Sequence, residues 1–177
     1  MSDCAKDGVT PDCGKAMAFL ILRGWLGIRA LVTGLEKYTG TRMVDHAWTD
    51  KAGKPDASGA MLDGGVPEKF YALSNYHAVP KSLEAKFAAE PLLPHFLTAP
   101  FYVILGPLLI LCGLSLLLGL GTRISLFVQG IVYIALTVGL ILINQNDGVA
   151  WLGIHIALIA MAMTLVNYNR FAICKKS

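Results

Sequence analysis

Charged residues are scarce in this sequence. Only 15% of its 177 residues are Asp, Glu, Lys or Arg, and 55% are hydrophobic, whereas soluble globular domains carry roughly 25% charged residues. The basic residues are scattered and form no run with interleaved aromatic residues, which is the pattern of nucleic-acid-binding proteins. The composition therefore excludes an ordinary soluble domain and favours a membrane protein with no nucleic-acid partner.

Motifs that hold a redox cofactor or a metal are also missing. The four cysteines, Cys4, Cys13, Cys112 and Cys174, are far apart and form no CxxC pair, so their spacing predicts neither a zinc site nor a disulfide framework. The sequence contains no CxxCH and no GxGxxG motif. His155 is the one histidine at membrane depth, and a haem held by two histidines would need another. We therefore predict no metal site and no intrinsic cofactor.

Four apolar stretches are long enough to cross a bilayer, which takes about 20 helical residues. They cover residues 16–38, 100–120, 124–143 and 149–166. The short turns at 119–123 and 144–148 are rich in Gly and Asn, as tight turns are. The predicted fold class is an all-α integral membrane protein, a single membrane domain in which a four-transmembrane-helix bundle carries a long extramembrane loop over residues 39–99. Within that loop, residues 80–90 predict one short helix.

The basic residues near the spans predict the orientation. No cleavable signal peptide is expected, because residues 1–15 are polar and no A-x-A-like site follows the first apolar run. With four spans, both termini and the turn at 119–123 share one side, and Lys and Arg concentrate on the cytoplasmic side of membrane proteins. That side carries Lys6, Lys15, Arg123, Arg170, Lys175 and Lys176. We therefore predict a multi-pass protein of a bacterial-type inner membrane, with cytoplasmic termini and the loop 39–99 in the periplasm.

The first span nevertheless carries four charges, on Arg23, Arg29, Glu36 and Lys37. An unpaired arginine at mid-bilayer costs at least about 2.5 kcal/mol, so these side chains are expected to face protein and not acyl chains. Arg29 and Glu36 share one stripe of the helical wheel, and two interpretations stay open. Either they pair with each other while Arg23 and Lys37 extend to the two membrane surfaces, or they line a site for a polar headgroup or a proton path.

A second stripe of the first span consists of small residues with basic ends. It contains Arg23, Gly27, Ala30, Gly34 and Lys37. Small residues let the backbones of two membrane helices approach closely. The stripe therefore predicts a seam on which another helix packs.

The third and fourth spans hold the other polar candidates. Gln129, Tyr133, Thr137 and Asn144 share one face of the third span, and such a stripe predicts hydrogen bonds between helices. His155 is the one ionisable residue inside the fourth span. A single membrane histidine is more often a hydrogen-bonded packing element than a ligand, and both uses stay open here.

Two motifs resemble the DoxX/DoxD-like family of small four-helix membrane proteins. The first is the R-x3-G-x6-G-x2-K spacing that begins at Arg23, which is similar to the first helix of that family. The second is the segment CGLSLLLGLGTRIS, which fits the family through Gly113, Gly119, Leu120 and Arg123. The glycines expected to pack helices are Gly27, Gly34, Gly113 and Gly119.

The long first connection and His155 resemble the DoxD-like branch, which is linked to thiosulfate:quinone oxidoreductase. The resemblance implies a subunit of a respiratory or sulfur-oxidising complex, with a bound quinone as its cofactor and other membrane or periplasmic subunits as partners. The residues that would contact the quinone or relay protons are Arg23, Arg29, Glu36, Gln129, Tyr133 and His155. One position departs from the family, since Leu109 stands where many members have a glutamate.

Two other classes of function stay open. A non-catalytic accessory subunit would use the glycine seam and the long loop to dock on a larger membrane complex. A small transporter would use the polar stripes to line a water path, and four helices from one chain would then have to oligomerise to form a pore. No self-contained catalytic motif is present.

Overall fold

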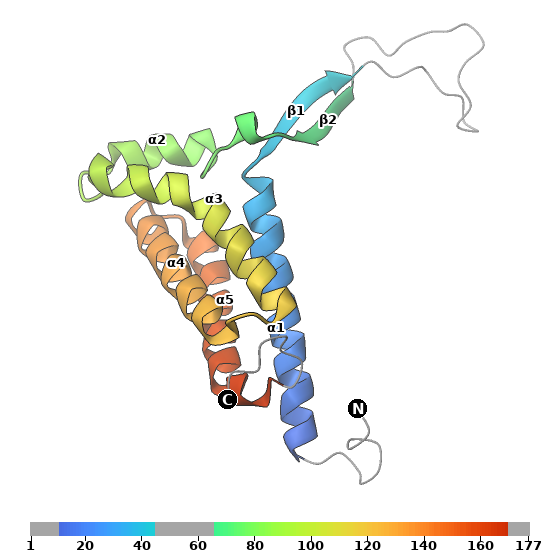
Figure 1. Ribbon diagram of the computed structural model, residues 1–177. Coiled ribbons are helices and arrows are strands. Elements are labelled where there is room, and N and C mark those ends of the chain that lie inside the picture. The colour runs from blue at the N-terminus through green and yellow to red at the C-terminus, as the bar shows by residue number, and fades with distance from the viewer. Residues whose placement is uncertain (1–10, 45–65, 170–177) are drawn as a thin grey trace, which may run out of the picture. The chain divides into compact units, whose positions relative to one another are not determined.

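The computed structural model describes residues 11–44 and 66–169. Its elements follow in the order α1 (Pro11–Glu36), β1 (Thr39–Val44), β2 (Val66–Tyr71), α2 (Lys81–Ala89), α3 (His95–Leu118), α4 (Thr122–Leu142) and α5 (Asn146–Leu165) (Figure 1). The chain divides into two compact units. One unit comprises residues 1–35 and 78–177 and holds the long helices, and the other comprises residues 36–77.

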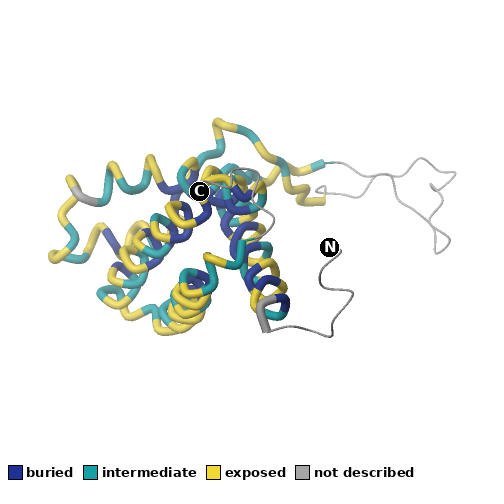
Figure 2. The backbone as a smooth tube through the Cα atoms, turned by 60° about the horizontal axis from the view of Figure 1, so that its bottom comes forward, coloured by how far each residue is buried: buried dark blue, intermediate teal, exposed yellow. Residues whose placement is uncertain are grey.

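Among the described residues, four helices are long and apolar enough to cross a membrane. The spans are Cys13–Glu36, Thr98–Leu118, Thr122–Leu142 and Asn146–Tyr168. Figure 1 shows α1 and α3 crossing each other, with α4 and α5 beside them. The outer faces of these helices are exposed and their buried residues face one another (Figure 2); Ile21 and Ile124, for example, are each 71% exposed. The predicted fold class is confirmed, and large apolar side chains on the outside are what lipid requires.

The seam predicted on α1 packs against α3 of the same chain. A Cβ atom added at Gly34 would lie 2.7 Å from the Ile110 side chain, and one added at Gly27 would lie 3.0 Å from Leu117. At Gly113 of α3 an added Cβ would lie 2.5 Å from the backbone nitrogen of Leu31. The glycines thus let two backbones touch, and the prediction of close helix packing is confirmed. Because this surface is used inside the bundle, it is not the docking surface that the accessory-subunit hypothesis expected.

The turn between α3 and α4 depends on two glycines. Gly119 ends α3 with a left-handed φ of 74°, and Gly121 precedes α4 with a φ of 52°. Glycine adopts this conformation without the steric penalty of a Cβ atom. Gly119 was expected to pack helices, but the structure gives it the role of a helix C-cap.

Helix α3 begins earlier than the sequence predicts and contains Pro100 and Pro107. The helix continues through both prolines to Leu118, although each proline removes one backbone donor. The short helix predicted at residues 80–90 is confirmed as α2. Its one buried residue is Phe87.

The unit of residues 36–77 contains a β-hairpin that the sequence did not predict. Strands β1 and β2 pair antiparallel, from Thr39 opposite Tyr71 to Val44 opposite Val66. The prediction that this region is a loop is therefore wrong for the two strands. Residues 45–65, which join the two strands and include His46, lie outside the described residues. The same holds for Lys6, Arg170, Lys175 and Lys176, which are four of the six basic residues that predict the orientation.

Cysteines give a further correction. Cys13, near the start of α1, is disulfide-bonded, although the spacing of the cysteines predicted no disulfide framework. Cys4 and Cys174 lie outside the described residues. Cys112 is a buried free cysteine on α3.

Candidate functional site

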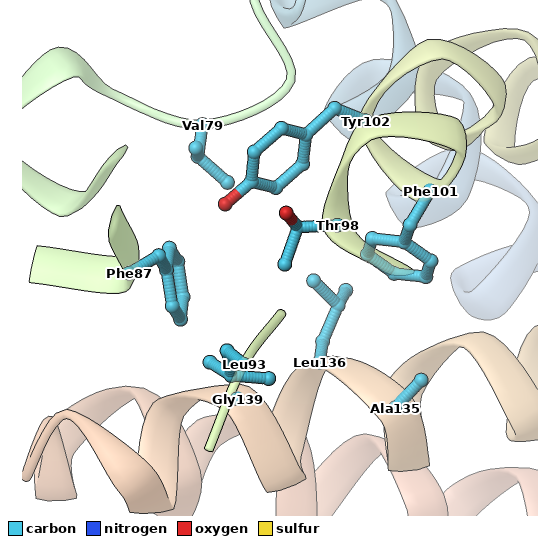
Figure 3. Close-up of a pocket in the computed structure, with 9 residues that line it drawn as sticks. All are labelled: Val79, Phe87, Leu93, Thr98, Phe101, Tyr102, Ala135, Leu136 and Gly139. Carbon is cyan, nitrogen blue, oxygen red and sulfur yellow. The ribbon is translucent and has the colours of Figure 1, made fainter. Parts of the chain in front are cut away.

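A cavity of about 190 Å³ lies between α2, the start of α3 and the second half of α4 (Figure 3). Its lining is predominantly apolar and consists of Val79, Phe87, Leu93, Thr98, Phe101, Tyr102, Ala135, Leu136 and Gly139. Gly139 lets the Phe87 ring lie against α4, because a Cβ at this position would be 3.2 Å from a ring carbon. The α3 and α4 residues that line the cavity belong to two membrane spans.

Two hydroxyl groups interrupt this apolar lining. Thr98 and Tyr102 are one helical turn apart on α3, and Figure 3 shows both side chains directed into the cavity. The Thr98 hydroxyl donates a hydrogen bond to the His95 carbonyl at 3.3 Å, which leaves its oxygen facing the cavity as an acceptor. The Tyr102 ring packs at 6.5 Å, centroid to centroid, from Phe87, and its hydroxyl is directed into the cavity.

A second cavity of about 250 Å³ adjoins the first and shares Phe87, Leu93, Thr98 and Tyr102 with it. Glu84 and His95 also line this second cavity, and both side chains are exposed. Ionisable groups in contact with water thus lie next to an apolar chamber that contains two hydroxyls. This arrangement suits a flat, apolar ring that carries polar atoms and exchanges protons with water.

Three of the candidates from the sequence come together in the core of the helical bundle. Gln129 is fully buried and donates to the Tyr133 hydroxyl at 3.1 Å and to the Leu26 carbonyl at 3.4 Å. The rings of Tyr133 and His155 meet edge to face, with centroids 5.8 Å apart. The predicted interhelical hydrogen bonding is therefore confirmed for Gln129.

The rest of that polar stripe bonds locally. Thr137 donates to the Tyr133 carbonyl of its own helix at 2.7 Å, and Asn144 lies in the turn after α4 with a φ of 56°.

His155 is held by the Trp151 carbonyl, 2.8 Å from its Nδ1. Because a carbonyl only accepts, Nδ1 carries a proton, and Nε2 is buried and has no partner among the described residues.

Arg23 is buried, and its guanidinium reaches the end of the bundle where the fourth span ends and the third span begins. It is 7% exposed and donates to the Asn169 side-chain oxygen at 2.8 Å. Asn169 in turn donates to the Thr122 hydroxyl at 3.0 Å. This network joins α1, the segment after α5 and the first residue of α4. Arg23 therefore holds these three elements together at one end of the bundle.

Arg29 and Glu36 do not pair with each other. Seven residues on a helix correspond to about 10.5 Å along its axis, whereas helical ion pairs form three or four residues apart. Glu36 instead accepts a hydrogen bond from Lys69 at 3.3 Å within the unit of residues 36–77. That hydrogen bond, together with the neighbouring Tyr71, raises the pKa of Lys69. The interpretation as an Arg29–Glu36 pair is wrong.

The six candidates therefore form no common site. Gln129, Tyr133 and His155 share the bundle core, while Arg23 and Glu36 take part in separate contacts. None of the six lines the cavity. Sequence analysis missed Thr98 and Tyr102, although their helical spacing at the start of an apolar run was a usable signal.

Comparisons with known proteins add no relative. The chain matches no protein-family model, no curated protein and no solved structure. The resemblance to the DoxX/DoxD-like family thus stays a prediction from the quoted motifs. Among the described residues, no group of three His, Cys, Asp or Glu side chains could hold a metal ion.

Proposed function

We propose that this chain is a membrane subunit of a quinone-linked oxidoreductase and that the cavity beside α2 receives the quinone ring. The observation that carries the proposal is a cavity lined by aromatic rings at the ends of two membrane spans, with the Thr98 and Tyr102 hydroxyls directed into it. Its volume of about 190 Å³ is below the 300–1,000 Å³ of pockets for drug-sized ligands. A single ring fits, and the isoprenoid tail would remain in lipid.

The polar groups match the two redox forms of such a ligand. Reduction of a quinone to a quinol takes up two electrons and two protons, which convert its two carbonyls into two hydroxyls. Tyr102 would donate to a quinone carbonyl, and the Thr98 oxygen would accept from a quinol hydroxyl. Glu84 and His95 would exchange the protons with water, and the electrons would come from an electron-transfer subunit of the same complex.

Binding of a short-chain benzoquinone to the purified protein in nanodiscs tests this proposal. Replacing Tyr102 with Phe removes one hydrogen bond, which is worth about 0.5–1.5 kcal/mol, so we expect the Kd to rise about three- to tenfold. Tyr168→Phe, outside the cavity, is the matched control and should bind as the unchanged protein does. Ala135→Trp places a large ring at the exposed edge of the cavity and should abolish binding.

Two results would count against the quinone site. One is the absence of saturable binding by the unchanged protein. The other is an Ala135→Trp variant that is folded, as judged by its helical circular dichroism, and still binds the quinone with the same Kd. Either result would contradict the proposal that the cavity binds a quinone, and neither would affect the four-helix fold.

We also propose that the termini face the cytoplasm of a bacterial-type inner membrane, because Lys15 and Arg123 lie at that end of the bundle. The disulfide of Cys13 stands against this orientation, because disulfides in the cytosol are transient, and so it provides a direct test. We expect Cys13 to be reduced in living cells and to become oxidised after lysis in air. Acid quenching followed by maleimide labelling, compared with a Cys13→Ser variant, measures this. A Cys13 that is oxidised at the moment of quenching would place the termini in the oxidising compartment.

The alternative is a non-catalytic accessory subunit that docks on a larger membrane complex. Both functions require partner subunits. The quinone-binding measurement distinguishes the quinone-linked subunit from the accessory subunit.

A further inference from the structure

Three polar side chains meet in the core of the helical bundle. Gln129 and Tyr133 lie one turn apart near the middle of α4, and His155 lies near the middle of α5, where its ring meets the Tyr133 ring edge to face. Gln129, Tyr133 and His155 are 0%, 4% and 6% exposed, and none of them lines either cavity beside α2. They form a separate polar group inside the membrane spans, which we call the core cluster.

The orientation of the Gln129 amide follows from its partners. Its nitrogen donates to the Leu26 carbonyl at 3.4 Å and to the Tyr133 hydroxyl at 3.1 Å. Because the Leu26 carbonyl can only accept, the amide nitrogen and not the amide oxygen faces it. The oxygen, Oε1, is buried and has no partner among the described residues. Gln129 thus presents one unused acceptor to the core.

His155 and Tyr133 add the other unused groups. The Nδ1 proton of His155 goes to the Trp151 carbonyl at 2.8 Å, while Nε2 is buried and has no partner in the part of the chain that the structure describes. The Tyr133 hydroxyl accepts from Gln129 and keeps its own hydrogen, for which residues 11–44 and 66–169 show no acceptor. The core cluster therefore holds two buried atoms without a partner and one hydroxyl hydrogen to donate.

A water molecule has the complementary set of hydrogen-bonding groups. Buried polar groups of native proteins nearly always have a partner, and the bilayer interior offers them no bulk water. One water can donate to Gln129 Oε1 and to His155 Nε2, and its oxygen can accept from the Tyr133 hydroxyl. Three hydrogen bonds to otherwise unsatisfied groups are typical of a buried water.

A small cation such as ammonium would also donate to the two acceptors, but the charge of the surroundings disfavours it. Two ionisable side chains act electrostatically on the Tyr133 hydroxyl, Arg29 from α1 and Cys112 from α3. Of these only Arg29 is a cation, and a second positive charge in a medium of low dielectric constant would be repelled by it. The site therefore favours a neutral donor.

We infer that the core cluster binds a water molecule, which donates to Gln129 and His155, accepts from Tyr133 and so joins α4 to α5 in the middle of the membrane. The hydrogen bond from Gln129 to the Leu26 carbonyl adds α1 to the same network. His155 is then a binding residue for an internal ligand as well as a packing element. The inference does not depend on the quinone proposal, because the cavity beside α2 uses none of these residues.

Solid-state NMR of the full-length protein in proteoliposomes tests the water. The chain has four histidines, so replacing His46, His77 and His95 with Gln leaves His155 as the only site for 15N-labelled histidine. Polarisation transfer from water protons to Nε2 then reports a water at hydrogen-bonding distance. We expect clear transfer to an Nε2 that carries no proton.

Variants of the core cluster in this single-histidine protein show what holds the water. Tyr133→Phe removes the hydroxyl and keeps the ring, and Gln129→Met removes the acceptor and keeps the shape of the side chain. Each removes one of the three hydrogen bonds of the water, so the transfer should fall about threefold or more. Thr137→Val is the matched control on α4, since Thr137 bonds the backbone of its own helix, and it should leave the transfer unchanged. If Gln129→Met does not fold, Tyr133→Phe decides alone.

Three results would overturn the inference. Nε2 could receive no polarisation from water, as expected if Tyr133 donated directly to His155 in a dry core. Nε2 could carry a proton at neutral pH, because the ring would then be a cation that donates. Finally, the transfer could be as strong in the folded Tyr133→Phe variant as in the single-histidine protein, which would mean that the core cluster does not hold the water.

Discussion

Replacing Gly113 with Ala is expected to destabilise the helical bundle by about 3 kcal/mol, the upper part of the range for overpacking. The added methyl group would lie 2.5 Å from the Leu31 nitrogen, 2.8 Å from the Gly27 carbonyl oxygen and 2.9 Å from the Leu31 Cα. All three are backbone atoms, so no side chain can rotate away and the two helices must separate. Titration of the protein with SDS in mild detergent micelles, followed by circular dichroism, measures the free energy of unfolding.

Gly24→Ala is the matched control for this substitution. Gly24 lies on α1, near the same seam, and an added Cβ would meet nothing within 4 Å. Alanine has the better helix propensity by about 1 kcal/mol, so this variant should be as stable as the unchanged protein or more stable. If the two alanine variants unfolded at the same SDS concentration, the close contact between α1 and α3 would not exist in the membrane protein.

The glycine seam was predictable from the sequence. Gly27, Ala30 and Gly34 recur at helical spacing within an apolar run, and a narrow stripe of small residues has few uses other than helix packing. The partner of the seam was not predictable, because the stripe does not say which helix fills it. Gly113 contributes the matching surface from α3, far away in the sequence.

The hairpin and the cavity were not predictable because both depend on distant contacts. Strands β1 and β2 are separated by residues 45–65, so no short turn motif marks them as a pair. The cavity requires Phe87 of α2 to reach Gly139 of α4, and nothing in either segment specifies the other. The helical wheel placed Arg29 and Glu36 on one stripe correctly, but it ignores the rise along the axis, which keeps them apart.

Replacing Arg23 with Leu is the other substitution for which a large effect is expected. The Arg23 guanidinium donates to Asn169, which donates to Thr122, and a hydrogen bond to a charged group contributes about 1.5–3 kcal/mol. Leucine would remove that donor, so the partly buried Asn169 side-chain oxygen would lose its hydrogen bond from Arg23. We expect a loss of about 2–3 kcal/mol in the free energy of unfolding, measured by the same SDS titration.

Lys15 provides the comparison that separates a buried cation from an exposed one on the same helix. Lys15 is exposed, donates to the Tyr168 hydroxyl at 3.1 Å and lies 4.9 Å from the centre of that ring. Exposed contacts of this kind contribute about 0.5–1 kcal/mol, so Lys15→Leu should have a small effect. If Arg23→Leu and Lys15→Leu lowered the free energy of unfolding equally, Arg23 would be hydrated in the membrane protein. The hydrogen-bond network that joins α1, α4 and the segment after α5 would then be absent.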